Sequence, residues 1–145
     1  MFKFLNNKYW FNFYLPSELF LSIGSIDRKS LELIFKNRML NFKRIILEEV
    51  SNNLFYVSIS FEKEKDFNSF KKYISEFKEL IPPWTAFPDL FQGVPRWNQG
   101  FQEDYCINNW IPFWNRLNEL EKIQYLKKYN CPNDWHEWLT NNNMN

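Results

Sequence analysis

Residues 42–61 read FKRIILEEVSNNLFYVSISF, and this stretch predicts a β-hairpin. The second arm, residues 54–61, alternates apolar and polar side chains, and a period of two residues is that of a strand with one buried face. Between the arms lies Ser51-Asn52-Asn53, and asparagine tolerates the positive φ that hairpin turns require. The side chains expected to point inward are Phe55, Val57, Ile59 and Phe61, and those expected to point outward are Tyr56, Ser58 and Ser60.

Two shorter patterns precede the hairpin. Aromatic residues occupy alternate positions of segment 8–15, and Pro16 follows it, which predicts one strand. Segment 20–24 is expected to form a second short strand that pairs back through the turn at Pro16. The alternating aromatic residues are Tyr9, Phe11 and Phe13.

One helix is expected on either side of the hairpin. Asp27 is the expected N-cap of the first, which runs to about Asn37. The second helix is expected to begin at Asp66 and to end before Pro82. The apolar residues at helical spacing are Leu31, Ile34, Phe35 and Met39 in the first helix, and Phe67, Phe70, Ile74, Phe77 and Ile81 in the second. The order of these elements predicts an α+β fold, a small antiparallel sheet with helices packed on one face.

The composition changes at Pro82. Six of the seven tryptophans follow it, and prolines and glycines interrupt residues 82–108, which predicts an ordered loop held by aromatic rings. Helices are expected within residues 109–140, with Pro112 in the first turn of one and a capping box at Asn118 and Glu121 opening the next. Their expected apolar faces are Trp110, Ile111, Trp114 and Leu117, then Leu120, Ile123 and Leu126, then Trp135, Trp138 and Leu139.

The length predicts one domain over residues 1–145. Its three parts are a sheet-and-helix part (1–81), the aromatic Pro/Gly loop (82–108) and a Trp-rich helical C-terminal part (109–140). Aromatic residues make up 21% of the chain, a surplus that a core of this size does not require. Trp110 and Trp114 lie at helical spacing and are expected in the core, whereas Trp84 and Trp97 lie in the loop and are expected on a partner surface.

The charge balance excludes several classes of partner. A net charge of +1 provides no general attraction for nucleic acid or an anionic membrane. The basic pairs Lys71-Lys72 and Lys43-Arg44 are interleaved with glutamates, which is typical of a solvated face. No apolar run reaches the ~18 residues of a membrane span, and two cysteines without a secretory leader favour reduced thiols in the cytoplasm.

Catalytic patterns are few. His136 is the single histidine, which excludes sites that need two, and no activating motif surrounds Cys131 as its partner nucleophile. Glu103 and Asp104 are paired carboxylates among aromatic residues, an arrangement that glycan-cleaving and glycan-binding sites use, although solvated or capping carboxylates are the more frequent case.

The C-terminal part contains the runs PPWTAFP (82–88), RWNQGFQEDY (96–105), NWIPFWNRLNELEKIQYLKKY (109–129) and PNDWHEWL (132–139). It resembles immunity proteins of contact-dependent inhibition and related polymorphic toxin systems of bacteria. The resemblance implies a cytoplasmic protein that binds the toxic C-terminal domain of a delivered effector, often a nuclease, and occludes its active site. Because such families have many unrelated folds, it implies nothing about the N-terminal sheet.

We therefore expect a non-enzymatic protein that blocks a cognate toxin sterically, without cofactor or metal and without direct binding to nucleic acid or membrane. The expected contact residues are Trp84, Trp97 and Arg96 as anchors, with Asp89, Glu103 and Asp104 facing basic groups of the toxin. One alternative is a carbohydrate-binding or carbohydrate-active protein that uses tryptophan stacking and paired carboxylates. Another is a phage or mobile-element protein whose partner is some other host enzyme.

Overall fold

The computed structural model describes residues 9–21, 26–90 and 99–141. The chain divides into two compact units. The first comprises residues 1–50 and 54–79, and the second comprises residues 51–53 and 80–145.

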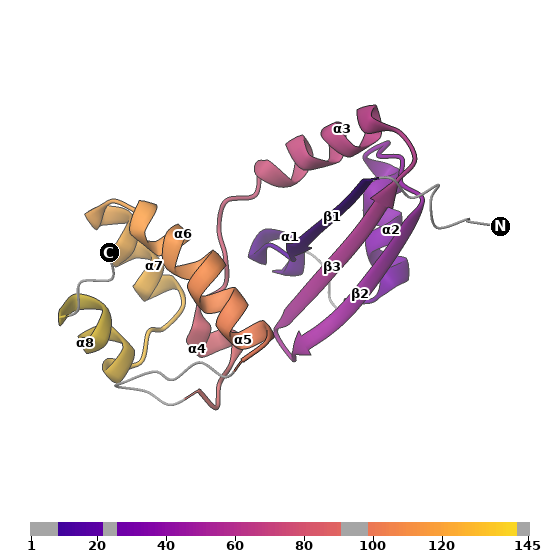
Figure 1. The fold of residues 1–145 in the computed structure, drawn as a ribbon. Coiled ribbons are helices and arrows are strands. Elements are labelled where there is room, and N and C mark those ends of the chain that lie inside the picture. Colours follow the sequence, from indigo (N-terminus) through magenta and orange to yellow (C-terminus); the bar gives the residue numbers. More distant parts are fainter. Residues whose placement is uncertain (1–8, 22–25, 91–98, 142–145) are drawn as a thin grey trace. The chain divides into compact units, whose positions relative to one another are not determined.

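The first unit contains a three-stranded antiparallel sheet in the order β1-β3-β2 (Figure 1). Its strands are β1 (Tyr9–Tyr14), β2 (Arg44–Ser51) and β3 (Leu54–Phe61). The predicted first strand and the predicted hairpin are both confirmed. In the central pairing, Tyr9 lies opposite Phe61 and Phe13 lies opposite Val57, so the alternate aromatic residues of β1 share a face with the inward residues of β3.

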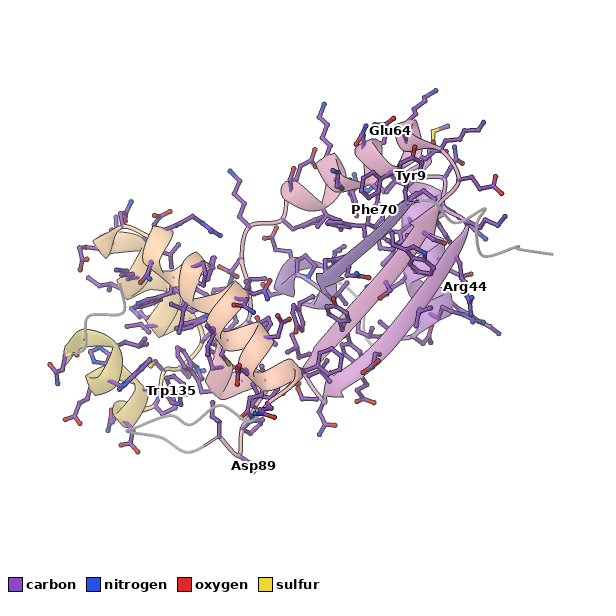
Figure 2. The ribbon with its side chains drawn as sticks, viewed as in Figure 1. Tyr9, Arg44, Glu64, Phe70, Asp89 and Trp135 are labelled. Atoms are coloured by element: carbon purple, nitrogen blue, oxygen red, sulfur yellow. The ribbon has the colours of Figure 1, made fainter. Side chains whose placement is uncertain are left out.

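Two helices, α2 (Arg28–Asn37) and α3 (Glu64–Ser75), pack on that face. Phe70 of α3 is the centre of the core (Figure 2), with its ring 4.9 Å from that of Phe35 and 5.4 Å from that of Phe61. The fully buried members of this core include Leu31, Phe35, Val57, Ile59, Phe61 and Phe70. The expected inward set of β3 is confirmed, and Ser60, which points outward as expected, is nevertheless fully buried.

The start of α2 is as predicted. Asp27 has extended backbone geometry, and its Oδ1 accepts a hydrogen bond from the Ser30 amide at 2.7 Å. The placement of Met39 on the apolar face of this helix is wrong, because the helix ends at Asn37 and Met39, with φ of 59°, is 87% exposed.

The predicted second short strand is wrong where the structure describes it. Residues 17–21 form a helical turn, α1 (Ser17–Leu21), and the remainder of segment 20–24 lies outside the described residues. Leu19 of this turn and the preceding Leu15 are both buried in the core.

Helix α3 ends at Ser75, six residues before the predicted end at Ile81. The ring of Phe77 folds back onto that of Tyr73 at 5.1 Å. The carbonyl oxygens of Leu80 and Ile81 then accept hydrogen bonds from the hydroxyls of Tyr125 and Tyr105 in the second unit. These bonds satisfy two main-chain carbonyls of the segment that links α3 to α4.

The second unit is helical. Its elements are α4 (Pro83–Ala86), α5 (Phe101–Glu103), the π-helix η2 (Asp104–Trp110), α6 (Ile111–Arg116), α7 (Glu119–Lys128) and α8 (Asn133–Asn141). Segment 82–108, expected to be a loop, is therefore helical at both ends, and residues 91–98 lie outside the described part. The α+β class and the Trp-rich helical C-terminal part are as predicted.

Pro112 lies in the first turn of α6, as predicted, but α6 continues a longer helical run. The run extends from Phe101 to Arg116, and its middle is π-helical, with the Ile111 amide bonded to the Cys106 carbonyl. Proline has no amide hydrogen and its ring crowds the preceding turn of an α-helix. The wider π-turn directly before Pro112 accommodates it without ending the helix.

Candidate protein-binding surfaces

Trp84 lies in the core of the second unit, not on a partner surface. It belongs to α4 and is 9% exposed. Its indole Nε1 donates a hydrogen bond to the carbonyl oxygen of Tyr129 at 2.9 Å, and its ring lies 5.6 Å from that of Trp135. The expectation that Trp84 anchors a partner is therefore wrong, because a buried ring presents no face to another molecule.

A network of buried hydrogen bonds accounts for much of the aromatic surplus. The indole Nε1 of Trp110 donates to the hydroxyl of Tyr125 at 3.0 Å, and that hydroxyl donates to the carbonyl oxygen of Leu80. Tyr105 is fully buried and donates to the carbonyl oxygen of Ile81 at 2.6 Å. Tyrosine and tryptophan contribute apolar area and also satisfy main-chain carbonyls, so they serve this core where leucine would leave polar groups unpaired.

The other expected contact residues do not assemble into one constellation. Asp89 and Glu103 are exposed, and within the residues that the structure describes neither carboxylate enters a hydrogen bond or ion pair (Figure 2 labels Asp89). Asp104 is half-buried and has a local structural role, since its Oδ1 accepts from Asn108 Nδ2 at 3.0 Å and its carbonyl accepts from Asn109 Nδ2 at 3.1 Å. Arg96 and Trp97 lie outside the described residues.

Helix α7 presents an apolar surface that the sequence reasoning missed. The capping box at its start is confirmed, with both reciprocal bonds between Asn118 and Glu121 present. Of the face predicted to be buried, however, only Leu126 is buried, whereas Leu120 and Ile123 are each 63% exposed. The buried side is centred on Tyr125 and Leu126. A helix with apolar residues on two sides is a signal that one of them remains open.

A hollow of about 420 Å³ lies beside Ile123. Helix α7, the turn after it and α8 form its walls. The lining residues are Ile123, Leu126, Lys127, Asn130, Cys131 and His136. We call Leu120, Ile123 and this hollow the α7 surface.

Cys131 and His136, considered above as a nucleophile and its base, both line this hollow. The Cys131 thiol donates weakly to the carbonyl oxygen of Pro132 at 3.4 Å, and burial raises its pKa to about 12. A thiol with such a pKa remains protonated near neutral pH, and the thiolate is the nucleophilic form. The arrangement gives no support to a cysteine nucleophile here. Cys106 is also a free thiol, and burial likewise raises its pKa to about 12.

The first unit carries a larger, open groove of about 1140 Å³ between α2 and β2. We call it the α2–β2 groove. Arg28, Lys29, Glu32 and Lys36 of α2 form one wall, and residues 42–47 form the other. The remaining lining residues are Ile26, Asp27, Glu49 and Phe55. Sequence reasoning noted Lys43 and Arg44 but not the α2 residues opposite them, because only the fold brings the two segments together.

The described part of the chain has neither a group of metal-ligand side chains nor a helix suited to crossing a membrane. In residues 9–21, 26–90 and 99–141, no three histidine, cysteine or carboxylate side chains are grouped as metal ligands would be. Among the described helices, none has the length and apolar character to cross a membrane.

Comparison of the chain with protein-family models, with curated proteins and with solved structures found no match in any of the three.

Proposed function

We propose that this protein is a bacterial immunity protein that binds the toxin domain of a cognate polymorphic toxin and blocks the toxin's active site sterically. The proposal is supported by the resemblance of the C-terminal sequence, which includes the whole of α7. It is carried by one structural observation, the open apolar side of α7.

Leu120 and Ile123 lie three residues apart on α7 and therefore on one side of the helix. Single exposed apolar residues are common on soluble proteins, but a pair beside a hollow with a polar rim has the composition of a protein interface. The rim here includes Lys127, Asn130 and His136. The exposed aliphatic side chains of Leu120 and Ile123, with polar residues around them, are therefore suited to binding another folded domain.

The α7 surface takes the place of Trp84 in this proposal. Asp89 and Glu103 remain as exposed carboxylates that would meet basic groups of the toxin, and Arg96 and Trp97 remain proposed contacts. The carbohydrate alternative gains no support from four of the C-terminal tryptophans, because Trp84, Trp110, Trp114 and Trp135 are buried and offer no open ring to a sugar.

The test is binding and protection against the toxin domain encoded by the neighbouring gene. Wild-type protein is expected to bind that domain in calorimetry and to restore growth of cells that express it. Leu120→Glu and Ile123→Glu should each weaken binding about 30-fold or more, the loss expected at an interface hot spot of 2 kcal/mol. Leu33→Glu is the matched control, since Leu33 is 60% exposed on α2 of the first unit.

The possible outcomes distinguish the proposed immunity function from the proposed α7 surface. A wild-type protein that neither binds nor protects against the neighbouring toxin refutes the immunity function. Wild-type binding that survives both α7 substitutions retains the function but refutes the α7 surface. Thermal unfolding of each variant shows whether a lost interaction reflects lost folding.

A further inference from the structure

Strand β2 is an outer strand of the sheet (Figure 1), and the direction of its main-chain groups can be derived from its neighbours. The carbonyl of Phe55 accepts from the Leu15 amide on the β1 side of β3, whereas the carbonyl of Ser60 accepts from the Lys43 amide on the β2 side. Alternate residues of a strand bond in opposite directions. The inward residues of β3, such as Val57 and Ile59, therefore bond toward β1 and not toward β2.

Residues directly opposite each other in an antiparallel pair share a face and share their bonding state. Ile45 and Leu47 of β2 share the core face with Val57 and Ile59. Their amide and carbonyl groups consequently point away from β3, toward the open side of the strand, and Glu49 continues the series. Because the Lys43 amide bonds toward β3, a β-bulge must interrupt the alternation between Lys43 and Ile45. Within residues 9–21, 26–90 and 99–141, no backbone group of another element pairs with this side of β2.

This open edge lines the α2–β2 groove, and the groove has an excess of positive charge. Five lining residues are basic and three are acidic. Some of these charges are already engaged, because Arg28 pairs with Glu32 at 3.5 Å, Lys43 pairs with Glu62 at 2.6 Å and Asp27 caps α2. Lys36 and Arg44 are exposed and enter no ion pair within the described residues.

We propose that the α2–β2 groove binds an extended acidic segment of another protein, which adds to the sheet as a fourth strand beside β2. Its main chain would bond to the free groups of Ile45, Leu47 and Glu49. Its side chains on one face would meet Lys36 of α2, and those on the other face would meet Arg44. An exposed strand edge is a template for pairing that natural proteins usually cover or protect.

The observations favour a protein segment over a nucleic acid. A strand edge offers donors and acceptors in alternation at the spacing of a second backbone, whereas a phosphodiester chain needs donors and cations only. This inference concerns the first unit and does not depend on the proposed immunity function.

The test uses the full chain labelled with ¹⁵N and three synthetic peptides. The acidic probe is Ac-TEVEVEVT-NH₂, the charge control is Ac-TKVKVKVT-NH₂, and the pairing control is Ac-TEPEPEPT-NH₂, whose prolines remove amide donors. At about 90% saturation with the acidic probe, amide exchange at Ile45, Leu47 and Glu49 should slow about ten-fold, because only the unbound fraction exchanges. The amides of Arg44, Ile46 and Glu48, which face β3, should change little.

Charge variants test the walls of the groove. Lys36→Glu combined with Arg44→Glu should weaken binding of the acidic probe at least ten-fold and improve binding of the lysine probe. Lys72→Glu combined with Lys78→Glu is the matched control, since it changes the net charge equally at two exposed residues that do not line the groove.

Four results would overturn the proposal. They are unchanged exchange at Ile45, Leu47 and Glu49 under saturating acidic probe, equal binding of the lysine or proline probe, tighter binding of the oligonucleotide dT₈, and protection of the same amides that rises with protein concentration without any peptide. The third result would assign the groove to nucleic acid, and the fourth to a second copy of this chain.

Discussion

The indole Nε1 of Trp84 donates its hydrogen bond to the carbonyl oxygen of Tyr129, the C-cap residue of α7. The last carbonyls of a helix have no partner within the helix. A side chain distant in sequence therefore satisfies the end of α7, and the same ring packs near Trp110 and Trp135. This contact makes Trp84 a structural residue of the second unit.

Replacing Trp84 should lower stability more than it alters any surface. Trp84→Ala is expected to cost about 3–5 kcal/mol of the free energy of unfolding, the usual range for truncating a buried tryptophan. Trp84→Phe keeps a ring but leaves the Tyr129 carbonyl without its donor, at about 1–3 kcal/mol. Urea denaturation measures both. Trp138→Ala, at a half-buried position, should cost less than Trp84→Ala, and the reverse order would contradict the core position of Trp84.

The two apolar sides of α7 should respond differently to truncation. Leu126→Ala removes a buried side chain and is expected to cost about 2–5 kcal/mol. Leu120→Ala and Ile123→Ala remove exposed side chains and should change stability by no more than about 0.5 kcal/mol. Thermal or urea unfolding of the three variants provides the comparison. Equal losses at all three positions would mean that Leu120 and Ile123 are covered in solution.

The thiol of Cys131 should react slowly. Because burial raises its pKa to about 12, its thiolate fraction at pH 8 is far below that of an ordinary cysteine, and alkylation by iodoacetamide should be slower by roughly two to three orders of magnitude. The rate should rise with pH well beyond pH 9. His136→Ala should leave the rate unchanged, whereas a loss of reactivity in that variant would reveal a histidine-activated thiol. Mass spectrometry separates Cys131 from Cys106.

The N-cap of α2 should contribute a pH-dependent part of the stability. The backbone hydrogen bond from Ser30 lowers the pKa of Asp27 below its ordinary value of 3.8. The unfolded chain then binds this proton more readily than the folded chain, so the contribution is present above pH 3.8 and is lost as pH falls through the lower folded pKa.

Asp27→Asn isolates this contribution, since asparagine can also cap a helix but does not titrate. The unfolding free energy of the wild type minus that of Asp27→Asn, measured from pH 6 to pH 2, should decrease in the acidic part of the range. A difference that stays constant throughout would show that the ionised carboxylate is not the capping form.

Local patterns were predicted reliably because their physical cause is local. The capping box joins Asn118 to Glu121, the cap of α2 joins Asp27 to Ser30, and both contacts span three residues. The alternation along β3 likewise follows from strand geometry. Ser60 keeps the outward direction of this alternation, opposite Trp10, and is nevertheless fully buried.

The candidate sites were predicted poorly because surfaces depend on distant partners. Trp84 has the sequence context of an exposed loop residue, and only Tyr129 and Trp135 bury it. Leu120 and Leu126 were predicted to lie on one apolar face, yet one is exposed and the other is buried. Helix α3 ends at Ser75 although apolar residues continue at helical spacing to Ile81, and the carbonyls of Leu80 and Ile81 bond to the distant Tyr125 and Tyr105.

The sequence by itself determined the hairpin, the helix caps, the α+β class and the aromatic, helical character of the C-terminal part. These follow from side-chain periods of two and 3.6 residues and from hydrogen bonds between near neighbours. The tertiary structure alone decided which tryptophans are buried, which side of α7 remains open and which edge of the sheet lines a basic groove. Those outcomes depend on contacts between residues far apart in the chain. The local sequence pattern around a residue therefore does not determine whether that residue is buried or exposed.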